Sequence, residues 1–190
     1  MPTSSNPEVY WTPPSVYAPN SLLPVLVYRN VVPADQGQDA IQKLIEANHW
    51  EKRGVWGHIA HAHYHSLTAE CYAPISGSTK CLYGASKYDD ESQGVRFEMK
   101  VGDIAVHPAG VAHCNLESTE DYRYFGLYPE GSSKADSVYT RLEGPQFAAK
   151  VNNARTCPIP EWDPIEGKNG PLPRIWREAA AKAAASDCAI

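Results

Sequence analysis

The chain has 190 residues, of which 43% are hydrophobic and 21% charged, and its formal net charge is −5. A chain of this length fits one domain that buries about 70% of the surface exposed by the unfolded chain. The acidic balance, with no Lys- or Arg-rich run, argues against nucleic-acid and membrane partners, and no apolar stretch approaches the ~18 residues of a transmembrane helix.

Residues 1–20 and the cysteines predict a cytoplasmic protein. The first 20 residues have neither a basic start nor an apolar run, so they do not resemble a secretory signal. The five cysteines are odd in number and show no CxxC spacing, which is typical of reduced thiols.

The N-terminal part of the chain predicts an arm, a strand and a helix, in that order. Residues 1–20 are rich in Pro, Ser and Tyr, and we expect an arm that drapes over the domain or frays. Residues 22–32 are apolar and β-branched, and Pro24 within them indicates an edge strand. The apolar spacing of residues 41–45 predicts an amphipathic helix over about 36–48.

The start of this helix carries a possible capping signal. Asp35 is followed three residues later by Gln38, a spacing that resembles a capping box.

Between residues 54 and 128 the pattern changes to short alternating segments separated by turns. Several strands without intervening helices predict a sandwich or small barrel rather than a parallel α/β sheet. The predicted strands are 55–65, 68–75, 79–86, 94–100, 103–107, 111–117 and 122–128.

Beyond Pro129 the chain is expected to wrap the barrel as an irregular tail, and Pro173 then opens a final Ala-rich helix. The predicted organisation is therefore an N-terminal arm (1–20), one domain with its flanking helix and wrapping tail (21–177), and a C-terminal helix end (178–190).

Histidines and a glutamate within this β-rich region predict a metal site. Side chains of a strand alternate between its faces, so His63 and His65 project to the same side. Glu70 adds a carboxylate, and His113 is the closing donor from the stretch 102–113. Imidazole and carboxylate donors suit Fe(II), Mn, Ni, Cu(II) or Zn. The neighbouring Cys71 and Cys114 are predicted to face the opposite side and to pack in the core.

The spacing of these residues resembles the two motifs of the cupin superfamily. The first motif runs from Gly57 through His63, His65 and Glu70 to Gly77, and the second from Gly102 through Pro108-Ala109-Gly110 to His113. Glu117 stands where the second motif usually has Asn, at a position that is not a metal ligand. The segments LPVLVYRNVVP, HYHS, FGLYPEGS and DPIEGKNGPLPRIW extend the resemblance to the small YjlB-like cupins over roughly residues 20–177.

This resemblance implies a mainly β fold, a double-stranded β-helix or jelly-roll barrel, flanked by a helix in the N-terminal half and a C-terminal helix. It also implies one divalent transition metal ion per chain, with Fe(II) favoured over Mn, Ni, Cu or Zn. The implied ligands are His63, His65, Glu70 and His113. Four protein ligands leave two positions of a six-coordinate ion for other molecules.

Other residues are candidates for the surroundings of the ion. On a regular strand 55–65, His61 would share the face of His63 and act as a general base at the pocket mouth. Tyr72 should share the inward face of Glu70 and is the second catalytic candidate. For His107, at a turn, a scaffold role is predicted. The roles of His58, Tyr83, Tyr122, Tyr124 and Tyr128 stay open.

Several activities fit such a site. The favoured hypothesis is an oxidoreductase of the dioxygenase type that acts on a small organic molecule. A metal-dependent isomerase, decarboxylase or dehydratase uses the same ligands, and a non-catalytic small-molecule-binding cupin is the alternative from another class. A sugar-nucleotide epimerase is disfavoured by the intact metal quartet. Homodimer formation through the arm or the 22–32 strand is a further hypothesis.

Overall fold

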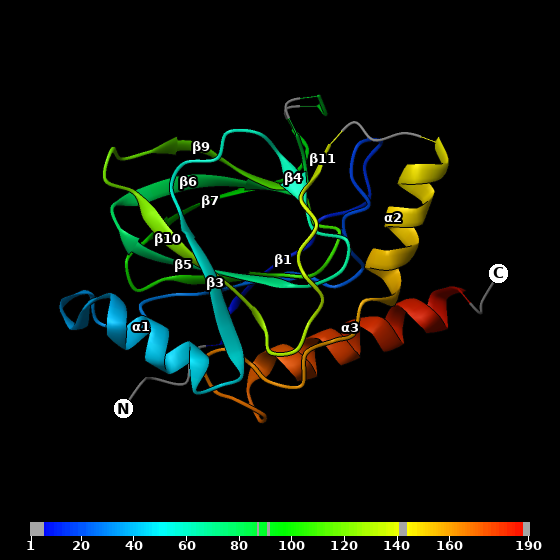
Figure 1. The fold of residues 1–190 in the computed structure, drawn as a ribbon. Helices are drawn as coiled ribbons and strands as arrows, with labels where there is room; N and C mark the ends of the chain where they lie inside the picture. The colour runs from blue at the N-terminus through cyan, green and yellow to red at the C-terminus, as the bar shows by residue number, and fades with distance from the viewer. Residues whose placement is uncertain (1–5, 87, 91, 141–143, 188–190) are drawn as a thin grey trace.

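Two antiparallel sheets face each other across a tyrosine-rich interior in the computed structural model, which describes residues 6–86, 88–90, 92–140 and 144–187 (Figure 1). In sheet order, one consists of β1 (Glu8–Tyr10), β2 (Val25–Tyr28), β8 (Ile104–His107), β5 (Glu70–Ser76), β10 (Arg123–Pro129) and β3 (Trp50–Trp56). The other consists of β11 (Val138–Tyr139), β4 (His63–Tyr64), β9 (His113–Ser118), β6 (Ser78–Tyr83) and β7 (Val95–Lys100). The mainly β jelly-roll fold expected from the sequence is confirmed.

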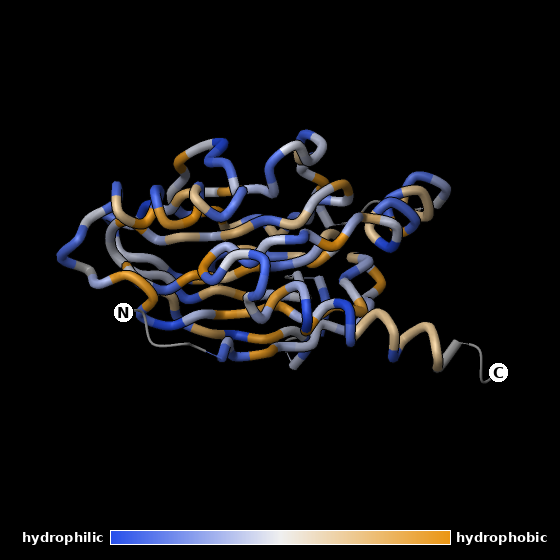
Figure 2. Tube along the Cα trace, turned by 90° about the horizontal axis from the view of Figure 1, so that it is seen from below, coloured by the Kyte–Doolittle hydropathy of each residue, from blue (hydrophilic) through white to orange (hydrophobic). Residues whose placement is uncertain are grey.

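Strand alternation separates an inner from an outer core. Along β10, Tyr124 packs with the inner cluster, whereas the next residue, Phe125, packs with the outer one. Successive side chains of a strand point to opposite faces, so each strand contributes to both cores. Figure 2 shows hydrophobic and hydrophilic stretches interspersed along the tube.

Helices cover the outer face of the six-stranded sheet. The helix α1 (Gly37–Glu46) buries Ile41 and Ile45, and α3 (Pro171–Asp187) buries Leu172 and Trp176, all in the outer core (Figure 1). The Trp176 indole N–H donates to the Pro24 carbonyl at 2.9 Å, which satisfies its only polar atom. Among the described residues, no helix is both long and apolar enough to cross a membrane.

The predicted wrapping tail is held by one buried carboxylate. Asp163 is fully buried and accepts hydrogen bonds from the Tyr28 hydroxyl and from the backbone N–H groups of Ile165, Glu166 and Leu172. These bonds join the tail to β2 and to the start of α3. The segment DPIEGKNGPLPRIW, which begins at Asp163, thus anchors the tail to the barrel.

The structure corrects three details near the N-terminus. Residues 8–10 of the arm form β1, so β2 lies inside the sheet rather than at its edge. Pro24 precedes β2, which therefore loses no ladder hydrogen bond to it. No side-chain hydrogen bond caps α1 or the preceding 3₁₀ turn (Ala34–Gln36), so the Asp35–Gln38 capping box was wrong.

Two further corrections lie in the barrel and the tail. The predicted strand 55–65 is instead β3, then an irregular loop over 57–62, then the short β4. The tail contains a helix, α2 (Gly144–Thr156), that the sequence did not predict. None of the described α2 side chains is buried, so the helix lacks the apolar stripe by which it would have been recognised.

Candidate metal centre

Side chains from both sheets converge in the barrel interior. His63 and His113 lie opposite each other on β4 and β9, and His65 follows β4 by one residue. Glu70 and His107 lie opposite each other on β5 and β8, in the other sheet. All five residues are buried, with at most 6% of each exposed. The structure thus brings the four predicted ligands together and adds a fourth histidine.

The three histidines of the cupin-like motifs are held in the same tautomer. Ring Nδ1 of His63 lies 3.2 Å from the His61 carbonyl, that of His65 lies 2.8 Å from the Asp136 carbonyl, and that of His113 lies 2.9 Å from the Val111 carbonyl. A carbonyl oxygen only accepts, so each Nδ1 carries the hydrogen. In the neutral rings the lone pair is therefore on Nε2, the atom free to bind a metal ion.

Glu70 has one oxygen that is bound and one that lacks a hydrogen-bond donor. The Tyr128 hydroxyl donates to Oε1 at 2.6 Å. Oε2 is buried without a hydrogen bond, although Nε2 of His65 is 2.9 Å away and Nε2 of His113 is 3.6 Å away. The ligand nitrogens of His63, His65 and His113 form one compact group, and the unsatisfied Glu70 oxygen lies within 4 Å of two of them, His65 and His113. This donor set fits a divalent first-row metal ion.

Burial and mutual charge act on these groups in different directions. Burial lowers the pKa of His63, and burial together with the neighbouring His107 and His63 keeps the pKa of His113 well below its usual range. Burial also lowers the pKa of His65, but the Glu70 carboxylate outweighs it and raises that pKa above its usual value. Burial would raise the pKa of Glu70, yet His65 and His107 hold it well below its usual range. Glu70 is thus held as a carboxylate.

His107 also belongs to this cluster, although the sequence analysis predicted a scaffold role for it. It lies on β8, two residues after the inward-facing Ala105, so strand alternation directs its ring into the barrel. Its Nε2 is 3.4 Å from Glu70 Oε2. Strand alternation could have predicted this inward position from the sequence, but the following Pro108 suggested that His107 lies in a turn.

The two predicted catalytic residues are placed very differently. Tyr72 is buried beside the cluster, with its ring centroid 5.3 Å from that of His107 and 5.4 Å from that of His113. The Tyr124 hydroxyl donates to the Tyr72 hydroxyl at 3.0 Å.

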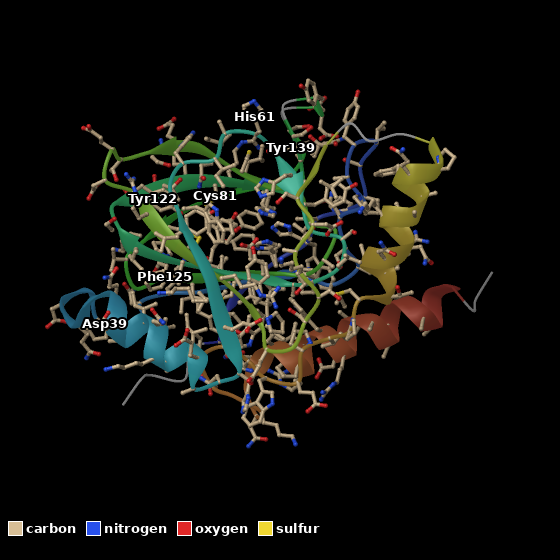
Figure 3. All side chains as sticks on the ribbon, in the orientation of Figure 1. Asp39, His61, Cys81, Tyr122, Phe125 and Tyr139 are labelled. Carbon is tan, nitrogen blue, oxygen red and sulfur yellow. The ribbon has the colours of Figure 1, made fainter. Side chains whose placement is uncertain are left out.

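The His61 side chain, in contrast, is exposed and lies near Tyr139 at the outside of the barrel (Figure 3). Together with Leu82 and Cys114, it lines a cavity of about 520 Å³. The expected position of His61 at the pocket mouth is therefore corrected: residues 57–62 form a loop, so strand alternation does not apply to them.

The remaining candidates divide between surface and interior. His58 is exposed and bonds to Ser118, with Nδ1 2.8 Å from Oγ. Cys71 and Cys114 pack in clusters apart from the inner core, in agreement with the prediction that they face away from the site. The tyrosines whose roles were left open are all buried: Tyr83, Tyr122, Tyr124 and Tyr128.

Trp56 forms a wall of the interior that the sequence analysis did not single out. It is 37% exposed, and its indole lies over Gly54 and Gly126, which face each other on β3 and β10. A Cβ built on either glycine would lie 2.4 Å from the indole, and one on Gly126 would also lie 2.8 Å from Glu70 Oε1. The two glycines thus leave room for an aromatic ring between solvent and Glu70.

Comparison with known proteins finds one curated relative. No family model matches the sequence. The chain is 29% identical over 173 residues to YjlB of Bacillus subtilis (strain 168), described as an uncharacterized protein, covering 89% of this chain and 96% of YjlB.

Solved structures match at low similarity. A mutant of oxalate decarboxylase from Bacillus subtilis matches with a TM-score of 0.33 and 14% identity over 67% of this chain. Vicilin from hazelnut, Corylus avellana, matches with a TM-score of 0.32 and 12% identity over 65% of this chain. The matched parts are 29% and 32% of those two chains. The sheet order and the two spaced motifs described above are observed in this chain itself and do not rest on these matches.

Proposed function

We propose, from the premise that this chain belongs to the cupin superfamily, that it is a mononuclear metal enzyme acting on a small oxygen-bearing organic molecule, as an oxidoreductase of the dioxygenase type. The premise rests on two spaced motifs whose histidines and glutamate meet inside a two-sheet jelly roll. The similarity to YjlB over nearly the whole chain agrees with it.

One observation carries the proposal. Three imidazoles with their Nδ1 atoms bound to carbonyls form a compact group, and two of them turn Nε2 toward a buried carboxylate oxygen that has no hydrogen-bond donor. His63, His65 and His113 would hold the ion through Nε2, and Glu70 would hold it through Oε2. When bound, an ion such as Fe(II) would supply Lewis acidity and one-electron redox chemistry.

The protein groups around this donor set have separable tasks. The Tyr128 hydroxyl fixes the orientation of Glu70 by donating to Oε1. The hydroxyls of Tyr72 and Tyr124 form a hydrogen-bonded pair beside the histidines, where they would orient an oxygen atom of the substrate. The inner core of aromatic side chains excludes water, which strengthens the electrostatic interactions in the site.

The donor set also argues against a purely structural site. Closed structural zinc sites are usually built with cysteine thiolates. Cys71 and Cys114 are adjacent in sequence to Glu70 and His113 but pack away from the inner core. An all-imidazole and carboxylate set leaves positions for exogenous molecules, as catalytic centres require.

The test is elemental analysis of protein purified without chelators, followed by oxygen uptake after Fe(II) loading. A panel of phenols, diketones and thiols serves as substrates. We expect about one metal ion per chain and substrate-dependent oxygen consumption. His65→Ala should lose tight metal binding and keep the fold, whereas His58→Ala, a surface control, should retain both.

Other results would redirect the proposal. Stoichiometric Zn, Mn or Ni without oxygen uptake would replace the oxidoreductase by isomerase or lyase chemistry. Failure to bind any metal after reconstitution would leave the barrel as a small-molecule-binding module. Unchanged metal content in His65→Ala would overturn the ligand assignment.

A further inference from the structure

We propose that His107 is a fifth protein donor to the metal ion, in addition to the three histidines and the glutamate of the cupin motifs. The inference rests on the proposed function in one respect, namely that an ion binds at this cluster. It concerns a residue that is not a ligand position of the two cupin-like motifs that suggested the site.

The first observation is that His107 is buried without a hydrogen bond. Only 2% of the residue is exposed, and neither ring nitrogen has a hydrogen-bond partner. Buried polar atoms in proteins nearly always have a partner, so two unpaired nitrogens on one ring require an explanation. The rings of Tyr72 and Tyr83 approach it edge to face, each with a centroid separation of 5.3 Å, and confine it without a polar contact.

The second observation is the position of its Nε2 relative to the other donors. Two donors bound to one ion at about 2.1 Å each lie about 3.0 Å apart when adjacent and about 4.2 Å apart when opposite. From Glu70 Oε2, the Nε2 atoms of His65, His107 and His113 are at 2.9, 3.4 and 3.6 Å. All three distances fall at or between these limits, so His107 fits the same coordination shell as His113.

The donors form two overlapping sets that share one residue. Ligand atoms of His63, His65 and His113 form one compact group, and those of Glu70, His107 and His113 form another. Because Nδ1 of His113 is engaged by the Val111 carbonyl, this residue has a single nitrogen for a metal. One nitrogen binds one ion, so an ion held by His113 adjoins both sets, and the two sets belong to one centre. Their five donor atoms do not all lie within 4.8 Å of one another, so binding would draw them together around the ion.

A fifth donor changes what the centre can bind. Five protein ligands leave one position of a six-coordinate ion, where four would leave two. Only one exogenous atom would then bind the ion at a time. A second reactant would be held beside it, against protein groups such as the Tyr72 and Tyr124 hydroxyls.

The experiment uses the whole 190-residue chain labelled with ¹⁵N in its histidines and loaded with ¹¹³Cd(II). A nitrogen bonded to this nucleus is split by it in the ¹⁵N spectrum, which counts the ligated imidazoles directly. We expect four split Nε2 signals among the seven histidines, with those of His49, His58 and His61 as unsplit internal references. In His107→Gln we expect three, together with a Cd(II) dissociation constant raised about 10- to 100-fold. His58→Ala should retain four.

Each outcome is decisive. Three split signals in the wild type, with His107 unsplit, would overturn the fifth donor and leave the proposed function intact. No split signal and no stoichiometric Cd(II) binding would overturn both. A raised dissociation constant in His107→Gln with a wild-type count of three would make His107 a positioning residue only. Because the count is made on the wild type, the result stands even when His107→Gln fails to fold.

Discussion

Adding one methyl group at Gly126 should disturb the candidate metal centre, whereas adding it at Gly54 should not. Both glycines lie under the Trp56 indole, and a Cβ on either would be 2.4 Å from a ring carbon. Only the Gly126 Cβ also reaches Glu70, with 2.8 Å to Oε1. Gly126→Ala and Gly54→Ala therefore form a matched pair that separates crowding of the indole from crowding of the carboxylate.

The expected magnitudes follow from these contacts. Inserting a methyl group into a packed site costs about 1–3 kcal/mol. Replacing Gly by Ala offsets about 0.4–1 kcal/mol of this by restricting the unfolded chain. Because Trp56 is 37% exposed and its ring can move outward, we expect the cost to lie near the low end, at about 1 kcal/mol for either variant. In Gly126→Ala the displaced Glu70 should also weaken metal binding about 10- to 100-fold. In Gly54→Ala metal binding should be unchanged.

The assay combines urea unfolding with chelator competition for Co(II) or Zn(II). Similar midpoints for the two variants, with a raised dissociation constant only in Gly126→Ala, would support the geometry. Wild-type affinity in both variants would refute the placement of Glu70 against Gly126. Equal loss of affinity in both would show that the effect passes through Trp56 rather than through the carboxylate.

Three further predictions concern polar groups that hold the tail or the candidate metal centre. Asp163→Ala removes a buried acceptor of several hydrogen bonds and should lower the free energy of unfolding by about 3–5 kcal/mol. The melting temperature should fall by about 10 °C, and a fall of less than about 2 °C would contradict the anchoring role of Asp163. Tyr128→Phe removes the 2.6 Å bond to Glu70 and should weaken metal binding about 10-fold without unfolding the protein, and unchanged affinity in chelator competition would contradict this. Burial would raise the pKa of Asp136, but the hydrogen bonds from Lys150 and Ser66 lower it below 3.8. The stabilisation by Asp136 is therefore fully present above pH 3.8 and is lost as the pH falls through the lower folded-state value, so acid unfolding of Asp136→Asn should begin at higher pH than that of the wild type.

Local sequence patterns predicted the barrel and most of the candidate centre. The alternation of apolar residues predicted most strands, since the side-chain period of a strand is a local property. The helix over residues 37–46 was predicted because its apolar stripe is equally local. The four predicted ligands were recognisable because His63, His65 and Glu70 are close in sequence, and because His113 ends a second motif of fixed spacing.

The errors arose where a segment depends on distant parts of the chain. Residues 8–10 become a strand only because β2 presents an edge to them. The loop over 57–62 carries His61 outside the barrel, although the same residues as a strand would have pointed it inward. The helix α2 has no apolar stripe from which the sequence could have predicted it, because none of its described side chains is buried.

The sequence by itself determined the fold class and the kinds of donor, because alternation and motif spacing reflect the chain's own geometry. Only the tertiary structure decided which groups meet. Glu70 faces the histidines from the opposite sheet, His107 reaches Glu70 through the pairing of β8 with β5, and Trp56 lies over two glycines on paired strands. The physical reason is that sheet pairing joins residues far apart along the chain, so these contacts have no local signature.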